Sequence, residues 1–171
     1  IVLKDLPDLR KHSKLDFSWT LAKGRGRYLC MSRLEARLHD EGHGDSDTMP
    51  LFLLDQPVDD EARSRATFEN MLASYGSRDW DGDRDHWPEQ IPDEIWRQVT
   101  TDHRQCTNRH CAYFDSCAFF DARKDLDDAD VVVANHDLVL ADLALGGGAI
   151  LPEPENALFI FDEAHHLPDK A

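Results

Sequence analysis

The stretch CTNRHCAYFDSC, residues 106–117, holds three of the chain's four cysteines, and the fourth is Cys30. One tight loop and one distant segment therefore supply all the thiols. A metal centre suits such a pattern, because the fold must bring the outlying ligand to the loop. The sequence predicts a domain organised around a metal site, with the residues on either side arranged to present this loop.

Three uses of the four cysteines compete. Disulfides are disfavoured, because nothing marks the chain as secreted and a reducing cytosol keeps thiols free. Zinc is a rival, with His103 and His110 as substitute ligands, although zinc sites usually pair cysteines two to four residues apart. The gaps of four and five residues in the loop suit a cubane iron–sulfur cluster equally well. Spacing alone leaves zinc and iron–sulfur open. Either site would be stabilised by the basic residues near the cysteines, which are Lys23, Arg25, Arg27, Arg104 and Arg109.

Length and composition favour one ordinary domain, or one domain with fragments of another. The chain has 171 residues, of which 41% are hydrophobic, and it shows neither a signal peptide nor a membrane-spanning run. We expect an intracellular, soluble protein without a membrane partner. Its net charge of −15 is uneven, because residues 1–40 carry nine Lys and Arg against five Asp and Glu. A basic N-terminal arm on an acidic body is compatible with a polyanion bound along one face, or simply with a solvated surface.

Periodicity predicts a mostly helical chain that ends in an α/β pattern. A helical connector is expected over residues 1–22, and a polar surface loop over residues 41–50. The spacing of apolar residues predicts helices over residues 31–39, 59–75, 93–100 and 118–129. The β-branched run at 131–133 predicts a buried strand, followed by a helix near His136 and a glycine-rich loop. Residues 158–161 predict a second parallel strand.

Two carboxylates follow this last apolar run directly. At the carboxyl end of a parallel strand, Asp162 could hold Mg2+ and Glu163 could activate a water that attacks a γ-phosphate. His165 could couple such a site to motion. No GxxxxGK[ST] loop occurs in the chain, and the GGGAI stretch at residues 146–150 has neither lysine nor hydroxyl. We therefore expect no ATP hydrolysis by this chain alone.

Several segments together resemble one family, the iron–sulfur superfamily 2 DNA helicases related to XPD, and most closely the bacterial DinG helicases. The similar segments are KDLPDL (4–9), KGRGRYLC (23–30), the cysteine loop, VVVANHDLVLAD (131–142) and FDEAHHLPD (161–169). The resemblance implies a mixed α/β fold, with a mainly helical iron–sulfur domain inserted in a partial RecA-like motor domain. It assigns residues 1–22 and 128–171 to motor domain 1, and residues 23–127 to the cluster domain.

The same resemblance implies the site residues. Cys30, Cys106, Cys111 and Cys117 would ligate a [4Fe-4S] cluster, while Asp162, Glu163 and His165 would form the DEAH box that acts on Mg2+ and ATP. Lys23, Arg25 and Arg27 would contact DNA phosphates.

The implied protein is a monomeric, bacterial, cytoplasmic and nucleoid-associated motor. It would use ATP to translocate 5′ to 3′ on single-stranded DNA and to unwind forked or displaced-strand structures. The alternative is a zinc-stabilised nucleic-acid-binding module without motor activity.

Overall fold

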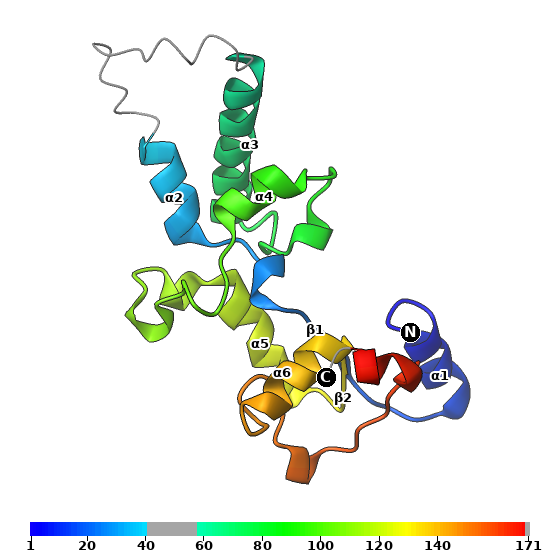
Figure 1. Ribbon diagram of the computed structural model, residues 1–171. Coiled ribbons are helices and arrows are strands. Elements are labelled where there is room, and N and C mark those ends of the chain that lie inside the picture. Colours follow the sequence, from blue (N-terminus) through cyan, green and yellow to red (C-terminus); the bar gives the residue numbers. More distant parts are fainter. Residues whose placement is uncertain (41–57, 170–171) are drawn as a thin grey trace. The chain divides into compact units, whose positions relative to one another are not determined.

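The structure is a computed structural model that describes residues 1–40 and 58–169 (Figure 1). The chain forms two compact units. Residues 1–24 and 121–171 form the strand unit, so named because it contains the two described strands. Residues 25–120 form the cysteine unit, which contains all four cysteines. The surface loop expected at residues 41–50 lies outside the described residues.

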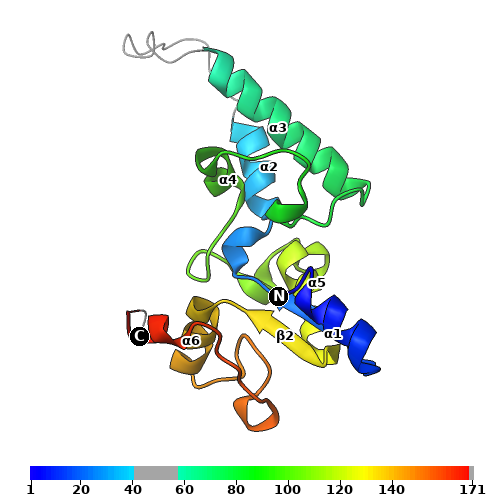
Figure 2. The same ribbon diagram turned by 90° about the vertical axis from the view of Figure 1, so that its right-hand side faces the viewer.

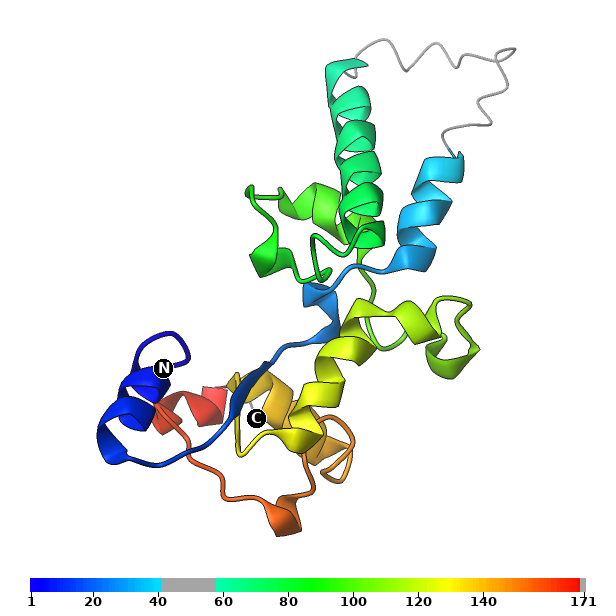
Figure 3. The ribbon, with the colours of Figure 1, turned by 180° about the vertical axis from the view of Figure 1, so that it is seen from behind.

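The sheet of the strand unit consists of two parallel strands, β1 (Trp19–Ala22) and β2 (Val131–Ala134), which lie side by side in Figure 3. Just before this pairing, the Ser18 backbone N–H and hydroxyl both donate to the Asp130 carboxylate, at 2.8 and 2.9 Å. These bonds fix the register in which Trp19 pairs with Val131. The strand predicted at 131–133 is confirmed, but its residues are half-buried and not buried as expected.

The helical connector expected over residues 1–22 is only partly correct. A helix, α1 (Asp5–Ser13), does form, and Pro7 lies in its first turn, where a missing N–H is tolerated. Residues 19–22, however, form β1. A four-residue strand has little periodicity of its own, and its distant partner β2 decides its conformation.

The helix predicted near His136 is confirmed as α6 (His136–Ala144). It begins at Asn135, whose side chain accepts a hydrogen bond from the Leu138 backbone N–H at 2.9 Å. Beneath β2 and α6 lies a small apolar cluster of buried residues, which comprises Ala22, Leu126, Val139 and Leu151. This cluster is the core of the strand unit.

The glycine-rich loop after α6 is organised by a buried carboxylate. Asp142 is 1% exposed and accepts hydrogen bonds from the backbone N–H groups of Gly148 and Ile150, at 3.0 and 2.5 Å. Gly146, Gly147 and Gly148 all have positive φ, and a Cβ on Gly147 would clash with Pro154 at 2.5 Å. The loop leads to the short 3-10 helix η6 (Pro154–Asn156).

The strand expected at residues 158–161 is not observed. These residues have no regular secondary structure, and Leu158 and Ile160 are 88% and 86% exposed. The parallel pair of the sheet is therefore β1 with β2, instead of β2 with residues 158–161. An apolar run forms a strand only when a neighbouring strand pairs with it, and no described strand pairs with residues 158–161.

The cysteine unit is built on three helices, α2 (Met31–Asp40), α3 (Val58–Gly76) and α4 (Asp93–Val99). Figures 1 and 2 both show α3 and α4 beside α2, in agreement with the contacts between these elements. The helices predicted over 31–39, 59–75 and 93–100 are thus confirmed. Their inward side chains form one dense core, whose deepest members are Leu34, Phe68, Met71 and Val99.

A turn between α3 and α4 closes this core with tryptophan. Trp80 is buried, makes an edge contact with Trp87 at 4.6 Å between ring centroids, and donates from its indole to the Asp83 carbonyl at 2.7 Å. The Asp83 carboxylate caps the 3-10 helix η3 (Arg84–His86) by accepting from Asp85 N–H. Gly82 has φ +82°, and a Cβ there would meet the Ala118 Cβ at 2.6 Å.

The helix predicted over residues 118–129 is confirmed as α5 (Ala118–Asp128). Phe119 and Phe120, at its start, belong to the cysteine unit, and Leu126, near its end, packs in the core of the strand unit. Among the described residues, no helix combines the length and apolar character needed to cross a membrane.

Candidate metal centre

The four cysteines line one hollow in the cysteine unit. Cys30, Cys106, Cys111 and Cys117 all have free thiols, are all half-buried, and all border this hollow. Aromatic rings form much of the remaining wall, contributed by Tyr28, Tyr113, Phe114, Phe119 and Phe120. The fold thus brings the distant Cys30 to the loop, as the metal prediction requires.

Cys30 is held by backbone bonds on both sides. Its N–H donates to the Val99 carbonyl at the end of α4, at 2.8 Å, and its carbonyl accepts from Leu34 N–H in the first turn of α2, at 2.9 Å. Just before it, Leu29 N–H donates to the Gly82 carbonyl at 2.8 Å. These bonds join the segment to three parts of the core, so the position of Cys30 is set by buried structure.

The other three cysteines follow tight turns. The 3-10 helix η4 (Asn108–His110) ends at Cys111, whose N–H donates to the Asn108 carbonyl at 2.9 Å. A second, η5 (Phe114–Ser116), ends at Cys117, whose N–H donates to the Phe114 carbonyl at 3.3 Å. Each short turn redirects the chain, so that successive cysteines return to the same hollow.

Electrostatics disfavours four bare thiolates in this hollow. Burial raises the pKa of the Cys30 thiol, and the charges of Cys111, Cys106 and Cys117 raise it further, although the Arg33 backbone N–H lowers it. A cationic group bound among the sulfurs would relieve both effects, because metal ligation requires and stabilises thiolates. The donor set and its surroundings therefore fit a thiolate-ligated metal group.

The two candidate groups differ in how they use the four cysteines that border the hollow. In the described part of the chain, no three His, Cys, Asp or Glu residues are arranged to hold a metal ion. A [4Fe-4S] cluster takes one thiolate at each of four irons and so needs donors spread around a volume, whereas zinc draws four donors to one centre.

Arg25 lies at the edge of this hollow. Its guanidinium donates from Nη1 to the Cys106 Sγ at 2.8 Å and from Nη2 to the Asn108 Oδ1 at 3.2 Å. The same guanidinium lies over the Phe119 ring, 4.1 Å from its centroid. The sequence predicts Arg25 as a DNA contact and as one of several basic residues near the cysteines, but nothing in its spacing from Cys106 indicates this hydrogen bond.

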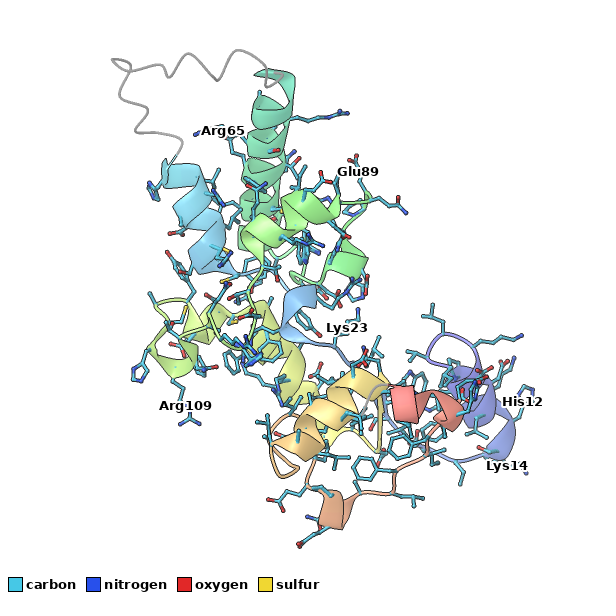
Figure 4. All side chains as sticks on the ribbon, viewed as in Figure 1. His12, Lys14, Lys23, Arg65, Glu89 and Arg109 are labelled. Carbon is cyan, nitrogen blue, oxygen red and sulfur yellow. The ribbon has the colours of Figure 1, made fainter. Side chains whose placement is uncertain are left out.

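The other two basic residues predicted to contact DNA are Arg27 and Lys23. Arg27 forms an ion pair with Asp85 on η3, and Lys23, labelled in Figure 4, belongs to the strand unit. DNA contact stays a prediction for all three residues. A pair that sequence reasoning missed is Tyr113 with Glu35, where the phenol donates to the carboxylate beside the hollow.

The predicted acidic residues lie in the strand unit. Asp162 and Glu163 are both exposed, and His165 Nδ1 lies 3.2 Å from the Glu163 Oε2. Glu163 has φ +51°, a left-handed conformation, just before the 3-10 helix η7 (Ala164–Asp169). The structure brings Glu163 and His165 together, and it places both in a different unit from the cysteines.

Two comparisons with known proteins find similar sequences. The DEAD_2 family model matches residues 88–171, which include the cysteine loop and the acidic end. The whole chain is 41% identical to part of the ATP-dependent DNA helicase DinG of Photobacterium profundum, and it spans 24% of that protein. It is 41% identical to DinG of Salmonella typhimurium and 40% identical to DinG of Escherichia coli K12, spanning 23% of each.

Residues 88–171 are thus similar to the DEAD_2 family. More particularly, the chain is similar to the DinG helicases over all 171 residues. It spans about a quarter of the length of these curated relatives.

Proposed function

We propose that this chain is part of an ATP-dependent DNA helicase and that its cysteine unit holds a [4Fe-4S] cluster. The observation that carries the proposal is the convergence of Cys30 with the three cysteines of the 106–117 loop on one hollow. The DinG relatives, named as ATP-dependent DNA helicases, support the motor activity. Zinc bound by the same residues remains the competing occupant.

Each cysteine would ligate one iron of the cluster. When bound, the cluster supplies a covalent cross-link between the segment that precedes α2 and the loop that precedes α5, together with one-electron chemistry. The chain's own residues position the sulfurs through the turns at η4 and η5, and the surrounding aromatic rings limit access of water and oxidants. Residues 23–127 would thus form the cluster domain of the helicase.

The strand unit would belong to the first motor domain, through residues 1–22 and 128–171. Its β1–β2 pair is parallel, as in a RecA-like sheet, and the exposed Leu158 and Ile160 offer an apolar run that a neighbouring strand could cover. In such a sheet, Asp162 would hold Mg2+ at the phosphates of ATP. Glu163 would accept a proton from the attacking water, and its contact with His165 would link the site to movement.

The DNA-facing part of the proposal follows from the same relatives. The full protein would translocate 5′ to 3′ on single-stranded DNA and open forked or displaced-strand duplexes. Lys23 and Arg27 are candidates for phosphate contacts, and Arg25 contributes positive charge nearby in sequence. The cluster domain would lie close to the point of strand separation and act there as a structural element.

A matched pair of glutamine substitutions tests the motor proposal in the full-length protein. Glu163→Gln is expected to reduce DNA-stimulated ATP hydrolysis by about 100-fold or more, the range for loss of a general base. Glu155→Gln, an exposed change in η6, is expected to leave it unchanged. Iron content serves as the check on folding. ATP hydrolysis within twofold of wild type in Glu163→Gln would contradict the assignment.

A further inference from the structure

The hydrogen bond from Arg25 to Cys106 suggests a role for this residue toward the metal group. Arg25 begins the 3-10 helix η1 (Arg25–Arg27), and its carbonyl accepts from Tyr28 N–H at 3.1 Å. The next carbonyl, of Gly26, accepts from the buried Trp96 indole at 2.7 Å. The backbone of Arg25 is therefore tied to the core of the cysteine unit, which gives its side chain a fixed origin.

The guanidinium is held on several sides. Nη1 donates to Cys106 Sγ and Nη2 to Asn108, so both donors reach one turn of the cysteine loop. The Phe119 and Phe120 rings lie 4.1 and 5.2 Å from its central carbon. Phe119 is buried, which excludes water from one face of the cation. A cation so placed is less screened than one in open solvent.

Neighbouring cations do not share this position. Arg33 donates instead to the Gln105 side chain at 2.5 Å. The Arg109 side chain points away from the ribbon of the loop in Figure 4. Arg25 is thus a fixed positive charge whose side chain donates directly to a ligand sulfur, while Arg33 offers a nearby comparison whose side chain donates to Gln105.

We propose that Arg25 is a positioning residue that holds Cys106 and raises the reduction potential of the cluster. The inference rests on the proposed function, because it requires the [4Fe-4S] cluster. Reduction adds one electron to an already anionic thiolate cluster. A fixed cation that hydrogen-bonds a ligand sulfur stabilises the reduced, more negative form more than the oxidised form. The bond to Asn108 and the two aromatic rings keep the guanidinium in place through this change.

Redox titration of the cluster-loaded protein, with an electron paramagnetic resonance readout, tests the proposal. Arg25→Gln should lower the midpoint potential by about 59 mV. For a one-electron couple this shift corresponds to a roughly tenfold decrease in the equilibrium constant for reduction. Arg25→Lys keeps a charge but cannot form the fork to Cys106 and Asn108, so it should shift the potential less and in the same direction. Arg33→Gln removes a nearby charge whose side chain donates to Gln105, keeps the Arg33 backbone N–H, and should shift the potential least.

A second readout is the rate of cluster loss to a chelator, which should rise in Arg25→Gln and stay near wild type in Arg33→Gln. If the Arg25→Gln protein does not bind a cluster, the midpoint potential of the Arg25→Lys protein alone tests the proposal. A wild-type midpoint potential in both Arg25 variants, or an equal shift in Arg33→Gln, would overturn the role of Arg25 and leave the cluster intact. Wild-type protein that binds zinc and no iron would overturn the cluster proposal and this inference together.

Discussion

In the cysteine unit, Leu34 and Phe68 are fully buried and the predicted ligands already border one hollow. In the strand unit, Leu158 is 88% exposed and the predicted Asp162 and Glu163 are exposed too. The first unit therefore contains the contacts that arrange its site. The second contains the residues of its site but, in its described part, only two strands of sheet, and two strands alone are a marginal support. We conclude that the metal proposal rests on observed geometry, whereas the motor proposal rests mainly on sequence similarity.

The largest expected effect comes from one leucine truncation made in each unit. Leu34→Ala should lower the free energy of unfolding by about 2–5 kcal/mol, because it removes a buried side chain and leaves a cavity. Leu158→Ala removes an exposed side chain and should change it by about 0.5 kcal/mol or less. Denaturant unfolding of the 171-residue chain measures both. Similar losses from the two substitutions would show that residues 158–161 are packed in solution, and would break the contrast between the units.

A smaller effect is expected from pH at the start of the sheet. Hydrogen bonds from Ser18, first from its backbone N–H and then from its hydroxyl, lower the pKa of the Asp130 carboxyl. A carboxyl with a lowered folded-state pKa stabilises the fold above its unfolded pKa of about 3.9, and this contribution is lost as pH falls through the folded value. Ser18→Ala should therefore destabilise the chain more at neutral pH than in strong acid, where only the pH-independent hydrogen bond from the Asp130 N–H to the Ser18 hydroxyl is lost.

Unfolding curves at neutral and acid pH, with a carboxylate NMR titration of Asp130, measure this effect. The control is the Asp130→Asn variant. In that variant, Ser18→Ala should lower the free energy of unfolding by the same amount at neutral and acid pH. If the loss of unfolding free energy caused by Ser18→Ala still depends on pH in the Asp130→Asn variant, a group other than Asp130 causes that pH dependence.

The helices were predictable because their own residues decide them. Leu34 and Leu38, four apart, predict one apolar face, and α2 buries Leu34 on it. The strand β1 was not predictable, since four residues acquire a strand conformation only by pairing with β2. Residues 158–161 show the opposite error. Their apolar character indicates a tendency to be buried, but it does not supply the neighbour that would bury them.

The candidate site also has features that the sequence predicts and features that it does not. The meeting of the four cysteines at one hollow could be predicted, because a metal site requires the fold to bring the distant Cys30 to the loop, while the bound metal stays a prediction. The partner of Arg25 could not, because Cys106 is 81 residues away and the contact depends on how η1 and η4 fold. Residue type indicates the kind of ligand, whereas the surrounding shell of contacts emerges only from the fold.

The most direct test of the central claim is the metal content of anaerobically purified chain, compared with Cys111→Ser and with Ala112→Ser, an exposed change in the same loop. We predict brown wild-type protein with about four irons and matching sulfide per chain, as a [4Fe-4S] cluster requires. Ala112→Ser should match wild type, and Cys111→Ser should lose both the iron and the colour. Colourless wild-type protein with one zinc, or full iron content in Cys111→Ser, would rule out a [4Fe-4S] cluster ligated by these four cysteines.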